Sequence, residues 1–94
     1  MFEIRAGSDG SIRLIGRLDA SEAQSAMAAL LRIDHSVTAD CGELDYISSA
    51  GLGVIIETYK RLHGLGFSLR LVNVPPRIRN VFHYAGLDQV IDIG

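Results

Sequence analysis

The stretch from Leu44 to Val54 holds the residues of this chain that are best suited to a chemical event. Two adjacent hydroxyl groups, on Ser48 and Ser49, precede two glycines, Gly51 and Gly53, and an apolar run. A serine in the first turn of a helix lies beside backbone N–H groups without intrahelical partners and beside the positive end of the macrodipole. Because these groups stabilise a phosphate, the segment is suited to a phosphorylation site that acts on a docked partner.

A purely structural interpretation of the same residues stays open. Ser48 or Ser49 would cap the helix, because serine is a preferred N-cap residue. Gly51 and Gly53 would then allow the helix to pack closely against the sheet. The residues alone do not decide between a helix cap and a phosphoacceptor.

Other catalytic and binding chemistries lack their residue patterns. The Gly51-Leu52-Gly53 stretch has no third glycine for a dinucleotide fingerprint, and no G-x-x-x-x-G-K phosphate loop occurs. The serines form no G-x-S-x-G elbow, and no histidine is placed by sequence as their base. No metal-ligand spacing joins Cys41 to the histidines, which are His35, His63 and His83. We therefore expect no enzyme activity, no metal and no cofactor, and a small buried role for Cys41.

The charged residues indicate a solvated surface. Nine basic and eleven acidic side chains give a net charge of -2, so no global field attracts nucleic acid or an anionic membrane. No aromatic platform interleaves with the basic residues of the predicted helices, which are Lys60, Arg61, Arg77 and Arg79. Two carboxylates, Asp19 and Asp45, could flank the serine loop, either as turn formers or as groups that contact a partner, and both roles stay open.

Strands and helices that alternate along the chain must position this segment. Period-2 hydropathy predicts strands at residues 12–18, 37–41 and 67–71, and residues 2–5 and 90–93 are short strand candidates. Helical apolar stripes span residues 23–31, 52–62 and 78–85. Such an order is typical of an α/β fold, with a small, mixed, largely parallel β-sheet packed with about three main helices.

Turn and capping residues mark the ends of these elements. The stretch 7–10 predicts a hairpin turn, and residues 42–47 are expected to form a loop before the second helix. Ser21 followed by Gln24 predicts a capping box at the first helix. The Pro75-Pro76 pair begins the third helix and Gly86 ends it.

Length and composition set the size and address that we expect. Ninety-four residues are enough for one domain, residues 1–94, with a folded surface of about 5,300 Å². An apolar content of 48% excludes disorder, and no run of apolar residues is long enough to span a bilayer. One cysteine and the absence of a signal-peptide pattern favour the cytoplasm.

The stretch Tyr46-Ile47-Ser48-Ser49-Ala50-Gly51-Leu52-Gly53-Val54 resembles the signature of STAS domains of the anti-sigma-factor antagonist type. Four further pieces are similar to family features, so the resemblance covers nearly the whole chain: Gly16-Arg17-Leu18-Asp19, Asp40, the strand from Leu69 to Val74 with its prolines, and Gly86-Leu87.

The resemblance implies a binding module controlled by phosphorylation. An anti-sigma factor that is a serine kinase would phosphorylate the position of Ser49, with Ser48 as the alternative acceptor, and a PP2C-type phosphatase would reset it. The unmodified form would bind the kinase and release the sigma factor. The expected partner contacts are Asp19, Asp45, Ser48, Gly51, Leu52 and Gly53, without nucleic acid or direct membrane insertion. The alternative is a STAS scaffold that is not phosphorylated, or an accessory subunit of a stress-signalling complex or a membrane transporter.

Overall fold

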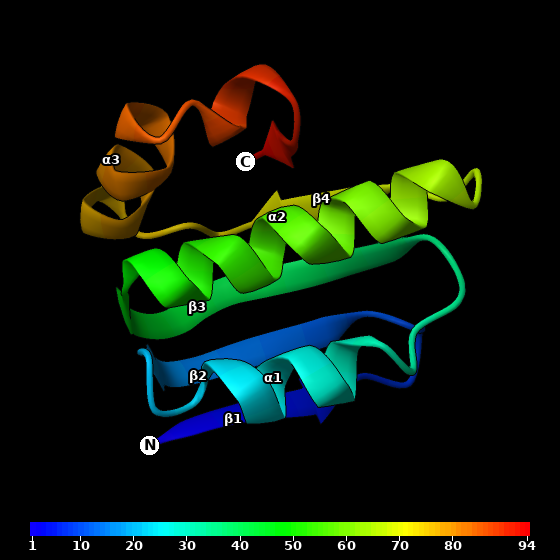
Figure 1. Cartoon of the computed structure of the whole chain (residues 1–94), viewed down its shortest axis with the longest axis horizontal. Helices are drawn as coiled ribbons and strands as arrows, with labels where there is room; N and C mark the ends of the chain where they lie inside the picture. Colours follow the sequence, from blue (N-terminus) through cyan, green and yellow to red (C-terminus); the bar gives the residue numbers. More distant parts are fainter.

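A five-stranded sheet with helices packed on it organises residues 1–94, all of which the computed structural model describes. The elements in chain order are β1 (Phe2–Ala6), β2 (Ile12–Leu18), α1 (Ala23–Leu30), β3 (Val37–Ile47), α2 (Ser49–Gly64), β4 (Leu69–Val72), α3 (Pro76–Tyr84), the 3-10 turn η1 (Leu87–Gln89) and β5 (Asp92–Ile93). Helices α1 and α2 lie side by side over the strands, and α3 packs near β3 (Figure 1). The predicted α/β fold is therefore confirmed.

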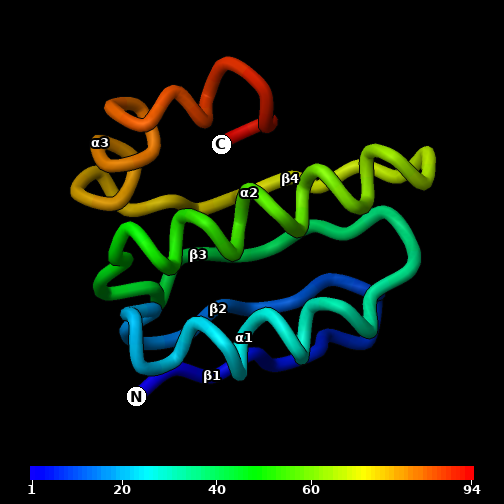
Figure 2. Tube along the Cα trace, viewed as in Figure 1, coloured from blue at the N-terminus to red at the C-terminus, as the bar shows by residue number.

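The sheet is mixed and largely parallel, as expected. Its order is β1-β2-β3-β4-β5, with an antiparallel β1–β2 hairpin and parallel pairing of the other strands. Leu18 is paired with Ile47, so β2 and β3 end together at one edge of the layer. The two chain ends lie by β1 and β5, at opposite sides of the sheet (Figure 2).

Strand β3 is longer than the sequence indicates. It runs from Val37 to Ile47, so the loop expected at residues 42–47 is wrong. After Cys41 the next buried residues are Leu44 and Ile47, which breaks the alternation that identifies a strand. The cause lies in the β2–β3 ladder, where register shifts locally offset the two strands without ending their pairing.

The capping box predicted for the first helix is also wrong. Helix α1 has Glu22 at its N-cap position and no side-chain cap. The Ser21 hydroxyl instead donates to the Asp19 carboxylate at 2.6 Å, because that charged acceptor lies two residues away. Leu31, the last residue of the predicted stripe, is exposed.

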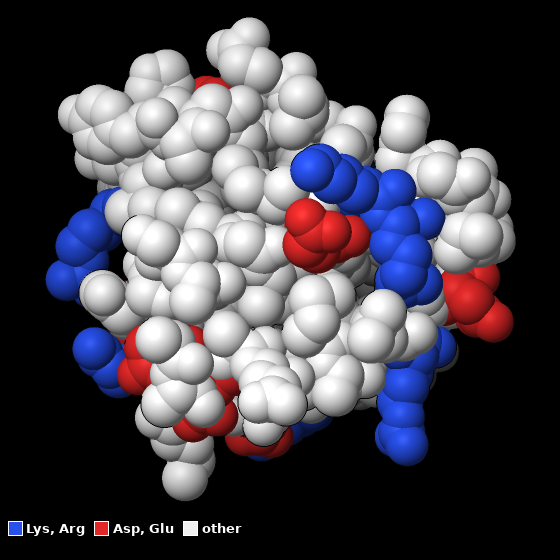
Figure 3. All heavy atoms as spheres, viewed as in Figure 1, with Lys and Arg blue, Asp and Glu red and all other residues white.

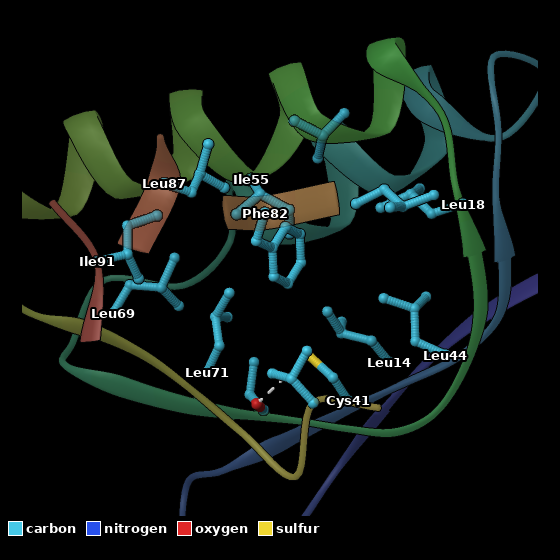
Figure 4. Packing of buried hydrophobic residues seen from close by; sticks show 14 of the residues in the cluster. Leu14, Leu18, Cys41, Leu44, Ile55, Leu69, Leu71, Phe82, Leu87 and Ile91 are labelled. Atoms are coloured by element: carbon cyan, nitrogen blue, oxygen red, sulfur yellow. Dashed lines mark hydrogen bonds between the residues drawn. The ribbon is translucent and has the colours of Figure 1, made fainter. Parts of the chain in front are cut away.

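One cluster of 20 buried apolar residues forms the core between sheet and helices. In Figure 4 the strand residues Leu14, Leu44 and Leu71 lie opposite the helix residues Ile55 and Phe82. The accessible surface of 5393 Å² agrees with the expected value for this length. No helix is both long and apolar enough to cross a lipid bilayer.

Cys41 is part of this core, as expected. Its side chain is fully buried, and burial raises the pKa of the thiol to about 12. The thiol therefore stays protonated and is not a nucleophile at neutral pH.

Candidate functional site

Helix α2 begins directly after β3, and Ser48 is the residue that joins them. Its backbone is extended, with φ -93° and ψ 176°, and its hydroxyl oxygen accepts the Gly51 N–H at 3.2 Å. The Ser48 N–H donates to the Leu18 carbonyl at the end of β2, at 3.0 Å. Ser48 is therefore the helix cap, and both its side chain and its backbone are engaged within the chain.

Ser49 is the first residue of α2, and its side chain is exposed. The N–H groups of Ser49 and Ala50 have no intrahelical acceptor, because a helix leaves its first N–H groups unpaired. An acceptor oxygen attached at Ser49 would thus lie beside free donors and the positive end of the helix dipole. Of the two serines, Ser49 is therefore the one whose side chain is exposed and takes no part in capping the helix.

The two glycines of the segment have different surroundings. Gly51 is buried, and a Cβ there would lie 2.5 Å from the Leu18 carbonyl oxygen and 2.9 Å from side-chain atoms of Leu18 and Ile47. Gly51 therefore allows α2 to approach β2, whereas its contact with a partner stays a prediction. A Cβ at Gly53 would have no neighbour within 4 Å, so nothing inside the protein requires a glycine there. Leu52 is half-buried against the core.

Asp19 serves the turn that leads into α1. Its Oδ1 accepts the Ser21 hydroxyl at 2.6 Å, the Ser21 N–H at 3.1 Å and the Glu22 N–H at 3.2 Å. The hydrogen bond from the Ser21 side chain is the main cause that lowers the pKa of this carboxyl from 3.8. Because Asp19 directly follows Leu18, it also lies at the strand ends from which α2 starts.

Asp45 is exposed near the end of β3, and its carboxylate makes no ion pair or hydrogen bond in the chain. Its backbone carbonyl accepts Nη2 of Arg77 at 3.3 Å. Of the two candidate carboxylates, Asp45 is thus the one that is free to contact a partner.

The lowered pKa of Asp19 predicts an acid-dependent loss of stability. Since the folded pKa lies below 3.8, the ionised carboxylate stabilises the native state above that pH and loses its effect as pH falls through the folded pKa. Asp19→Asn should flatten this fall in the free energy of unfolding, measured by urea denaturation across the acid range. An unchanged slope in Asp19→Asn would contradict the prediction.

A hollow beside the serine segment was missed by sequence reasoning. The Arg17 guanidinium lies 4.4 Å from the centre of the Tyr46 ring, and Arg77 approaches from the first turn of α3. The hollow has a volume of about 410 Å³ and is lined by Arg17, Asp45, Tyr46, Ile47, Arg77, Ile78 and Val81. These residues come from β2, β3 and α3, so only the fold brings the two arginines together. The one sign of this hollow in the sequence was the outward position of Arg17 in the alternation of β2.

The chain segment that carries Ser49 contains no charged residue. No charged residue occurs between Tyr46 and Ile56, and the next acidic residue is Glu57. Figure 3 shows that uncharged side chains cover most of the face that bears the helices. A phosphate on Ser49 would therefore introduce a charge of about -1.5 to -2 into a neutral segment.

Fold and site together define a small α/β domain with an exposed helix-start serine and no group of residues that could hold a metal. The model of the family described as "Mlab, STAS domain" matches residues 1–92. The Bordetella bronchiseptica protein "Putative anti-sigma factor antagonist BtrV" is 31% identical over 81 residues, which are 85% of this chain and 70% of the relative. The chain therefore belongs to the STAS domain family, as the resemblance predicted.

Further relatives agree with this assignment. The "Anti-sigma-B factor antagonist" of Bacillus subtilis is 39% identical over 51 residues, 54% of this chain and 47% of that protein. Among solved structures, an anti-sigma factor antagonist of Thermotoga maritima, described as putative, matches with a TM-score of 0.82 at 20% identity, over 99% of this chain and 85% of that one. The unphosphorylated antagonist SpoIIAA has a TM-score of 0.72 at 17% identity, over 100% and 87% of the two chains. At these identities the structures show a shared fold.

Proposed function

We propose that this chain is an anti-sigma-factor antagonist that binds a serine-kinase anti-sigma factor and is released from it by phosphorylation of Ser49. The observation that carries the proposal is that the Ser49 side chain is exposed at the first turn of α2, whereas the Ser48 side chain is already engaged as the helix cap. The names of the Bordetella and Bacillus relatives support the antagonist role.

In the unmodified state the partner docks over the start of α2. Leu52, Gly53 and the free carboxylate of Asp45 supply contacts around Ser49, and Gly53 leaves room for a close approach. The bound kinase then releases its sigma factor. In this mechanism residues 1–94 act in the cytoplasm as one STAS domain, and the catalysis belongs to the partners.

Phosphorylation reverses this binding. The helix start stabilises the phosphate, so the domain stays folded while the new charge faces the docked partner. Burying that charge in an interface without a counter-charge costs free energy, and the kinase dissociates. A PP2C-type phosphatase removes the phosphate and returns the chain to its binding state.

The test is phosphorylation by the anti-sigma serine kinase of the source organism with MgATP, followed by tandem mass spectrometry of the peptide that contains both serines. We expect one phosphate on Ser49, lost in Ser49→Ala. Ser48→Ala should still be phosphorylated, although loss of the cap lowers the free energy of unfolding by about 1 kcal/mol. Phosphate on Ser48 would move the site, and no phosphate would favour the scaffold or accessory-subunit role.

A further inference from the structure

Strand β1 is an edge of the sheet, and its outer side has no partner in the chain (Figure 1). In the β1–β2 ladder the Met1 carbonyl accepts the Arg17 N–H at 2.9 Å, and the Gly7 N–H donates to the Ser11 carbonyl at 2.7 Å. Hydrogen-bonded pairs alternate along an antiparallel ladder, so the odd-numbered residues of β1 bond to β2. The N–H and C=O groups of the even-numbered residues, Phe2, Ile4 and Ala6, therefore point away from the sheet.

We propose that two copies of this chain form a dimer through their β1 edges, paired antiparallel about a two-fold axis at Ile4. In this register Ile4 faces Ile4 of the second copy, and Phe2 faces Ala6 of the second copy. These are the residues whose backbone groups point outward, so each of these facing pairs forms two inter-strand hydrogen bonds. The two sheets then become one continuous sheet.

The charges of β1 select this register. Glu3 and Arg5 alternate with the even-numbered residues and are exposed on the same face of the strand. Pairing about Ile4 places Glu3 opposite Arg5 of the second copy, and symmetry repeats the pair. A slip of two residues in relative register, in either direction, would place Glu3 opposite Glu3 or Arg5 opposite Arg5, which is destabilising. Charges on an edge strand commonly prevent pairing, whereas this pattern is complementary to itself.

The other face of β1 gives the dimer an apolar component. Phe2 and Ile4 are half-buried there, beside a groove of about 170 Å³ between β1 and α1. The groove is lined by Phe2, Ile4, Glu22, Ser25, Ala26 and Ala29. The small side chains of Ser25 and Ala29 leave space for the approach of a second copy, and pairing of the strands covers the groove.

Little is lost when Glu3 and Arg5 exchange partners. Within one chain, Nε and Nη2 of Arg5 donate to Oε2 of Glu3 at 3.0 and 2.8 Å, and both side chains are exposed. Such exposed pairs contribute little to stability, so the cross-strand pairs of the dimer replace them at small cost.

Charge reversal tests the proposal. Sedimentation velocity of the parent, from micromolar to millimolar concentration, should show the mass rise from 10.2 kDa to twice that value. Glu3→Arg and Arg5→Glu each place like charges opposite one another twice, so each should raise the dimer dissociation constant about tenfold or more. An equimolar mixture of these two variants should form a heterodimer, and the double reversal should restore the homodimer.

Two controls apply the same charge changes on the two strands farthest from β1. Asp92→Arg and Arg70→Glu lie on β5 and β4, and both should dimerise like the parent. A parent that stays monomeric at all concentrations overturns the proposal. Dimers that both β1 reversals leave intact, or a double reversal that stays monomeric, would do the same. Kinase binding through Ser49 is a separate measurement, so either proposal can fail alone.

Discussion

Ser49→Asp is expected to bind the anti-sigma kinase at least about tenfold more weakly than the parent, whereas Ser49→Ala should bind as tightly as the parent. The reason is that the variant places a negative charge in the docked interface, where residues 46–56 of this chain supply no basic side chain, and a charge buried without a counter-charge costs free energy. Because a phosphate carries more charge than an aspartate, the phosphorylated parent should bind more weakly still. Calorimetric titration of the kinase with each variant measures the dissociation constants.

The matched control is Ser8→Asp, which introduces the same charge at an exposed serine. Ser8 lies in the turn before β2, at the far end of that strand from Leu18 and the start of α2. This variant should bind like the parent. If both aspartate variants weakened binding equally, net charge would be the cause, and if neither did, Ser49 would not be the switch.

Gly51→Ala should lower the free energy of unfolding by about 3 kcal/mol. The added methyl group would lie 2.5 Å from the Leu18 carbonyl oxygen, and this is a backbone atom that cannot move without displacing β2 or α2. The same carbonyl accepts the Ser48 N–H, so a displaced helix start would also strain that hydrogen bond. Urea denaturation with a fixed m-value gives the change in stability.

Gly53→Ala is the control for this substitution, two residues further along the same helix. Its methyl group has no neighbour within 4 Å, and alanine is the better helix former, so stability should rise by up to about 1 kcal/mol. Equal effects of the two substitutions would show that helix propensity, rather than contact with Leu18, decides the outcome at Gly51.

Local patterns predicted the elements that pack on one face of the sheet. The bounds of β2 follow from its alternation, and α2 contains the whole apolar stripe of residues 52–62. The end of β3 could not be predicted in this way, because the offsets in its pairing with β2 change which side chains face the core. The sequence of one strand does not show how the neighbouring strand will pair with it.

The candidate site was predicted only in those features that depend on neighbouring residues in the sequence. The serine pair at a helix start is a local feature, and it lies where the pattern placed it. Which serine is the cap depends on the backbone at Ser48, and the difference between Gly51 and Gly53 depends on Leu18, more than thirty residues earlier in the chain. Arg17 and Arg77 meet at one hollow only because β2 and α3 lie near each other in the fold.

The contacts between Leu18 and the start of α2 have a consequence for the rate at which the domain could switch partners. The Ser48 N–H bonds to the Leu18 carbonyl, and Gly51 packs against the same residue, so two independent contacts tie the helix end to β2. Under the proposed function, phosphorylation of Ser49 would therefore change the surface at the start of α2 without refolding the domain. Under that proposal, the dissociation rate of the partner would set the response time, and substitutions of the exposed side chains around Ser49 would change that rate with little effect on the stability of the domain.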